Sequence, residues 1–89
     1  MNGYDDFHIP ATTISFNINI DYHGIVIVKI YHAKGQFIKL LAMQANGSGL
    51  YEIFWDGSDK NGDIAASGLY FYSVDFRDAV LASKMILLK

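Results

Sequence analysis

The sequence contains no cysteine, only one proline, and no apolar stretch long enough to cross a bilayer. Without cysteine, the chain can form no disulfide, thiolate metal site or thiol nucleophile, although this alone leaves the cellular compartment open. A membrane-spanning helix needs about 18 consecutive apolar residues, and the first ten residues lack the positive and apolar regions of a signal peptide. The sequence therefore predicts no membrane span.

An excess of positive charge is also missing. Seven Lys and Arg residues stand against nine Asp and Glu, which gives a net charge of −2, and no basic run is present. Nucleic acid is therefore not an expected partner. What the chain does contain is apolar side chains, at 52% of its 89 residues, and this content predicts one packed domain.

Short runs of β-forming residues follow one another along the chain, separated by glycine-containing turns. In residues 12–20, apolar and polar side chains alternate strictly, which is typical of a half-buried strand. Residues 36–43 would also suit a short helix, but the neighbouring runs favour a strand. The expected strands cover residues 12–20, 25–32, 36–43, 50–55, 69–76 and 80–89. Six or seven strands of this length predict an antiparallel β-sandwich.

The large aromatic residues suggest a core and one alternative. Trp55, Phe16 and Phe71 are expected to fill the interior, because a thin sandwich needs large side chains there. Tyr70 and Tyr72 share one face of their strand and could instead stack on sugar rings, which makes a carbohydrate-binding module an alternative. We favour packing for most of these residues.

The stretch 56–63, DGSDKNGD, is rich in oxygen ligands and glycine. Aligning Gly62 with the invariant glycine of an EF-hand loop puts glycine at both anchoring carboxylate positions, so that motif is absent. An irregular calcium site at Asp56, Asp59 and Asp63 stays an alternative. The favoured interpretation is a turn, because Asp and Asn cap turns and glycine adopts positive φ. The turn-forming residues are expected to be Asp56, Gly57, Asn61 and Gly62, and no cofactor is expected.

No catalytic arrangement is expected either. His23 and His32 stand at opposite ends of one predicted strand, roughly 30 Å apart, and cannot share a metal ion. The serine in NGSG lacks the spacing of a nucleophile elbow. The sequence therefore predicts a protein that is not an enzyme.

Four segments in order carry a family resemblance: PATTISFNI, VKIYHAKGQFIKLL, WDGSDKNGDIAASGLYFYSV and SKMILLK. Together they resemble the C-terminal sorting domain of type IX secretion substrates. The related immunoglobulin-like domain of flagellar hook-capping proteins is similar as well. The resemblance covers residues 9–89, and residues 1–8 are expected to be disordered or of cloning origin.

The resemblance implies an all-β, antiparallel immunoglobulin-like sandwich of about seven strands. It also implies a non-catalytic sorting domain that directs a larger exported protein through the periplasm and across the outer membrane to the cell surface. The implied partners are the outer-membrane secretion machinery and, in many substrates, a sortase-like peptidase. The residues expected to be recognised are Gly68, Tyr70, Lys84, Met85, Ile86, Leu87, Leu88 and Lys89.

A second function class follows from the hook-capping resemblance. Such a domain would be a structural interaction module that holds subunits together through its sheet faces or edges. A terminal strand can pack in the core and also offer its backbone edge to a partner by strand addition. The oligomeric state and the recognised surface stay open.

Overall fold

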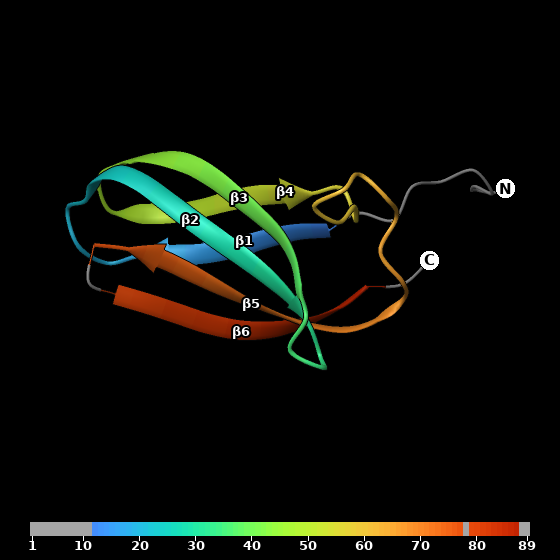
Figure 1. Ribbon diagram of the computed structural model, residues 1–89. Helices are drawn as coiled ribbons and strands as arrows, with labels where there is room; N and C mark the ends of the chain where they lie inside the picture. Colours follow the sequence, from blue (N-terminus) through green and yellow to red (C-terminus); the bar gives the residue numbers. More distant parts are fainter. Residues whose placement is uncertain (1–11, 78, 88–89) are drawn as a thin grey trace, which may run out of the picture.

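The computed structural model describes residues 12–77 and 79–87, and these residues form six antiparallel strands without a helix (Figure 1). The strands are β1 Thr12–Ile18, β2 His23–His32, β3 Phe37–Asn46, β4 Gly49–Trp55, β5 Gly68–Phe76 and β6 Ala79–Leu87. This part of the chain includes no helix that could cross a membrane. The predicted all-β fold class is confirmed. The expectation for residues 1–8 lies outside the described residues.

The strands form two sheets that face each other (Figure 1). One contains β1 and β4, and the other has the order β3-β2-β5-β6. β2 therefore lies between two neighbours, while β3 and β6 are the edges of the larger sheet. β5 and β6 form a hairpin, in which Gly68 pairs with Leu87 and Phe76 with Ala79.

The segment that also suited a helix is a strand, and it extends to Asn46 as β3. It pairs with β2 through a tight turn in which Gly35 has a φ of 88° and donates its N–H to the His32 carbonyl at 2.8 Å. The register shifts between Ile30 and Tyr31, where a β-bulge bends the strand. Pairing along the hairpin overrides the helix propensity of Leu, Ala and Met.

The core is built from side chains that alternate inward along the strands of both sheets. Trp55 is completely buried and Phe16 is 7% exposed, as predicted. Ile20 was expected on the buried side, but it is 39% exposed because β1 ends at Ile18. The core residues are Ile14, Phe16, Ile18, Val26, Val28, Ile30, Ile38, Ala45, Trp55, Ala65, Tyr70, Val74, Phe76 and Leu87.

The prediction that Phe71 belongs to the core is wrong. In β5, Tyr70, Val74 and Phe76 point inward, so that Phe71 lies on the opposite side of the sheet and is 42% exposed. Successive side chains of a strand point to opposite faces, so burial of these three residues places Phe71 on the outer side.

About seven strands were expected, and the described residues contain six. Residues 56–67, between β4 and β5, make only an isolated bridge between Ser58 and Ile64. Gly57 and Gly62 adopt φ values of 83° and 87° there, which reverse the chain instead of extending it. This loop lies at one end of the sandwich (Figure 1).

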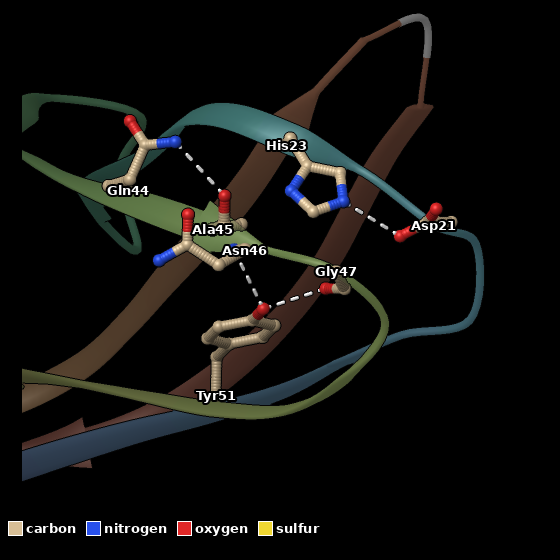
Figure 2. A network of polar contacts seen from close by, with 7 residues as sticks. All are labelled: Asp21, His23, Gln44, Ala45, Asn46, Gly47 and Tyr51. Carbon is tan, nitrogen blue, oxygen red and sulfur yellow. Dashed lines mark hydrogen bonds and ion pairs between the residues drawn. The ribbon is translucent and has the colours of Figure 1, made fainter.

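At the other end, Tyr51 fixes the turn between β3 and β4 (Figure 2). Its hydroxyl accepts the Asn46 N–H at 3.0 Å and donates to the Gly47 carbonyl at 2.7 Å. Its ring stacks on Phe16 with the centroids 6.0 Å apart. The turn that carries the chain from the larger sheet to the smaller one is thus tied to the core.

Candidate functional site

The aspartate-rich loop, residues 56–67, directs its carboxylates at its own backbone. Asp56 Oδ1 accepts the Ser58 N–H at 2.9 Å and the Ser58 hydroxyl at 2.6 Å. Asp59 Oδ1 accepts the N–H groups of Asn61 at 2.8 Å and Asp63 at 3.0 Å. Bonds of this kind are typical of Asx-turns, in which the side chain replaces a backbone acceptor.

The loop is fastened to both sheets. Trp55 Nε1 donates to the Ser58 carbonyl at 2.8 Å. From β3, the ammonium group of Lys39 donates to Ser58 Oγ at 3.0 Å and to the Asp59 carbonyl at 3.3 Å. Lys39 therefore links β3, an edge strand of the larger sheet, to the loop that follows β4 of the smaller sheet.

Tyr70 closes the loop at its far end. Its hydroxyl donates to the Ala66 carbonyl at 2.5 Å, and its ring meets Trp55 edge to face with centroids 5.4 Å apart. A tyrosine at the start of a strand that bonds back to the preceding corner is a recurring feature of immunoglobulin-like sandwiches. Because Tyr70 is 1% exposed, its ring is not available to stack on a sugar, and Tyr72 is only partly exposed.

Among residues 12–77 and 79–87, no group of three or more His, Asp or Glu side chains could hold a metal ion together. His23 lies 2.9 Å from Asp21 at one end of β2, and His32 Nδ1 accepts the Lys34 N–H at 3.2 Å at the other. His32 also borders a hollow of about 290 Å³ beside Asp59, Ala65 and Tyr70. These histidine contacts lie within local turns.

The hydrogen bonds from Ser58 lower the pKa of Asp56, with Lys39 adding a smaller effect in the same direction. A lowered pKa stabilises the fold above the ordinary value of 3.8, and this contribution is lost as the pH falls through the lower folded value. We expect Asp56→Ala to reduce the free energy of unfolding by up to about 1 kcal/mol at pH 7, because the site is exposed. Urea titrations at pH 7, 5, 4 and 3 should show this difference shrinking toward the acid end.

Asn61→Ala is the matched control, because Asn61 is exposed in the same loop and carries no titrating group. Its effect should not change with pH. An Asp56→Ala penalty that is the same at pH 3 as at pH 7 would contradict this interpretation.

The residues expected to be recognised lie together on β5 and β6, but they face opposite sides of the sheet. Tyr70 and Leu87 are buried, and Met85 packs against the core from the same side. Lys84 and Ile86 point the other way and are exposed. Leu88 and Lys89 lie outside the described residues. Gly68, with a φ of 152°, begins β5 opposite Leu87.

A further exposed feature is an apolar surface that sequence reasoning missed. We call it the outer face: the side of the four-stranded sheet that points away from β1 and β4. Its exposed apolar residues are Ile25, Leu40, Leu69, Phe71, Val80 and Ile86. An ion pair between Lys29 and Asp75, 3.6 Å apart, lies among them. In the sequence, residues 25–32 carry β-branched side chains on both faces, and this run is the signal for a second apolar side. Exposed apolar patches of this kind mark interaction sites.

Comparison with known proteins assigns the domain to a family. The model of the FlgD Ig-like domain matches residues 11–79. A similar solved structure is FlgD from Xanthomonas campestris, which is described for the hook capping essential for flagellar assembly. It superposes with a TM-score of 0.69 and is 27% identical in sequence. The match covers 90% of this chain and 57% of that chain. FlgD from P. aeruginosa has the same fold, with a TM-score of 0.66 and 22% identity over 86% of this chain and 60% of the other. No curated protein matches.

The assignment to type IX secretion sorting is therefore wrong, because the matching family and both similar structures are FlgD proteins. The partners that this assignment implied, the outer-membrane secretion machinery and the sortase-like peptidase, are wrong for the same reason. The hook-capping alternative agrees with the findings. The chain spans less than two thirds of either FlgD structure. It belongs to the FlgD Ig-like domain family.

Proposed function

We propose that this domain is a non-catalytic structural module of a hook-capping protein and that it contributes protein-binding surface during flagellar assembly. The observation that carries the proposal is the family match over residues 11–79, together with the 27% identity to a FlgD described for hook capping. The FlgD structures extend beyond the region matched here, so the capping activity is proposed for the whole protein, with this domain as one part.

The surface chemistry supports a binding role. The outer face combines exposed apolar side chains with few charges, and Phe71 and Ile86 are 42% and 65% exposed. Interfaces between proteins are depleted in charge at their centre and enriched in aromatic residues. We propose that Lys84 and Ile86, which are exposed members of the predicted recognition set in the described part of β6, bind a protein partner. The predicted cell-surface location stays a prediction.

Removing the domain from its own gene tests the proposal. A strain whose protein lacks residues 11–89 should fail to assemble hooks, measured by electron microscopy of the cell surface and by swimming in soft agar. Ser15→Ala is the control, because Ser15 lies exposed on β1, away from the outer face. Normal hooks and normal swimming in the deletion strain would overturn the proposal.

A double substitution then locates the surface. Phe71→Ser with Ile86→Ser should lower the melting temperature, because part of the Phe71 side chain is covered, but should leave the domain folded and reduce hook assembly. If the folded variant supports full assembly, the outer face is not the binding surface.

A further inference from the structure

The edge strand β6 is the most exposed strand of the larger sheet. Residues 80–84 are exposed on both sides of the strand, and β6 contributes only Leu87 to the fully buried core. Within the described residues β6 pairs with β5 alone, so its other edge presents a row of backbone donors and acceptors without strand partners. Such an edge is a template for another strand.

β6 also lacks the features that prevent edge pairing. Natural edge strands are protected by proline, bulges or several charges. β6 contains no proline, its pairing with β5 runs from Ala79 to Leu87 without a register shift, and Lys84 is its only charged residue. The opposite edge, β3, pairs with β2 through a bulge. Among residues 12–77 and 79–87, the two edges of the larger sheet are therefore unequal, and β6 is the one without a bulge or a second strand partner.

The sequence of β6, AVLASKMIL, is nearly symmetric about Ser83. In an antiparallel pair of two copies with Ser83 on the two-fold axis, residues equidistant from Ser83 lie directly opposite each other. The opposed pairs are Ala79 with Leu87, Val80 with Ile86, Leu81 with Met85, and Ala82 with Lys84. Every large apolar residue meets an apolar one, and the single charge meets alanine.

Other registers are less favourable. Residues that lie opposite each other must point to the same face of the continuous sheet, so the two-fold axis has to pass through a residue. The nearest alternative registers therefore place Ala82 or Lys84 on the axis. With Lys84 on the axis, the two ammonium groups would oppose each other directly, which is destabilising. With Ala82 on the axis, Lys84 would face Val80 and Ile86 would lose its opposed strand residue. Only the axis at Ser83 pairs all nine residues of β6.

We infer that β6 pairs with β6 of a second copy of this chain, antiparallel and centred on Ser83, to form an eight-stranded sheet. The hollow of about 380 Å³ lined by Phe71, Ala82, Ser83 and Lys84 lies beside the axis, so the two copies bring their hollows together there. The inference rests on the proposed structural role and names one partner for it. A single strand pair buries less area than a stable dimer needs, so the association is weak and favoured by high local concentration.

The register makes opposite predictions for two substitutions at one exposed position. Ala82→Glu places a carboxylate opposite Lys84 in both copies and should tighten the dimer about threefold to tenfold. Ala82→Lys places two like charges opposite each other twice and should weaken it by a similar factor. Sedimentation equilibrium of the full 89-residue chain from about 10 µM to 1 mM at low salt gives the three dissociation constants.

The controls use the other edge of the same sheet. Ala42 is exposed on β3, so Ala42→Glu and Ala42→Lys should leave the dimerisation constant unchanged. Since the chain has no cysteine, Ser83→Cys should also form a disulfide between two copies under mild oxidation, whereas Ala42→Cys should not. Far-UV circular dichroism confirms that each variant is folded.

A strictly monomeric chain at 1 mM, or a shift in the same direction for both Ala82 variants, would overturn the inference. Failure of pairing is distinguishable from failure of the proposed function. If the chain is monomeric but deleting the domain abolishes hooks, the β6 pairing is wrong and the hook-capping role stands. If the chain is dimeric but the deletion leaves hooks intact, the hook-capping role is wrong and the β6 pairing stands.

Discussion

Trp55→Ala is expected to destabilise the domain by about 3–5 kcal/mol, which is the cost of emptying a large buried aromatic site. Trp55 is completely buried at the end of β4, and its indole N–H donates to the Ser58 carbonyl at 2.8 Å. The substitution removes a completely buried core side chain and also the hydrogen bond that ties the aspartate-rich loop to it. The free energy of unfolding of a domain of this size is small, so the variant should be largely unfolded at 37 °C.

Thermal melting followed by far-UV circular dichroism measures this effect, because removing the only tryptophan also removes the tryptophan fluorescence. For a domain of 60–100 residues, each kcal/mol corresponds to about 4–8 °C, so the melting temperature should fall by more than about 12 °C. Phe54→Ala is the neighbouring control, since Phe54 is 61% exposed. A fall of only a few degrees for Trp55→Ala would show that the core does not depend on this side chain.

The strands and the buried side of β1 followed from the sequence because alternation of apolar and polar residues reports burial directly. In 12–18, polar residues separate Ile14, Phe16 and Ile18, and all three are buried. The same rule fails for 70–72, because tyrosine and phenylalanine alternate and both phases are apolar. Which phase faces inward is decided by Val74 and Phe76 further along the strand.

The outer face could not be recognised for a related reason. Ile25 and Ile27 indicate an apolar second side of β2, but a sequence does not say whether a layer covers that side. Covering it would need a third layer, and the strands of the described residues form two sheets. Lys39 is a similar case, since its contacts with Ser58 and Asp59 depend on how the β2–β3 hairpin bends over the loop.

The incorrect function has a physical origin as well. The motifs that suggested a sorting domain, around Trp55, Asp56 and Tyr70, are those that build the corner between β4 and β5. Asp56 and Trp55 both bond to Ser58, and Tyr70 bonds to Ala66. Residues that build a corner serve the fold, and one fold serves several functions. Such motifs identify an immunoglobulin-like corner more reliably than they identify a task.

Tyr70 carries the second large effect, and two substitutions separate its ring from its hydroxyl. Tyr70→Ala empties a site between Trp55 and His32, whose ring centroids lie 5.4 Å and 5.2 Å from that of Tyr70, and should cost about 3–5 kcal/mol. Tyr70→Phe keeps the ring and loses only the bond to the Ala66 carbonyl, so it should cost about 0.5–1.5 kcal/mol. Urea titration at pH 7 gives both values, and equal losses would mean that the hydroxyl, not the packing, matters.

The pH dependence gives an independent check on the same side chain. Burial raises the pKa of the Tyr70 phenol above its ordinary value of 10.0, so the unfolded chain loses this proton before the folded one does. The stability that the phenol contributes is therefore complete below pH 10 and is lost as the pH rises through the higher folded value. Since Tyr70→Phe has no proton to lose there, its deficit relative to the wild type should shrink between pH 9 and pH 11. A deficit that stays constant over this range would mean that the phenol is as accessible to water in the folded domain as in the unfolded chain.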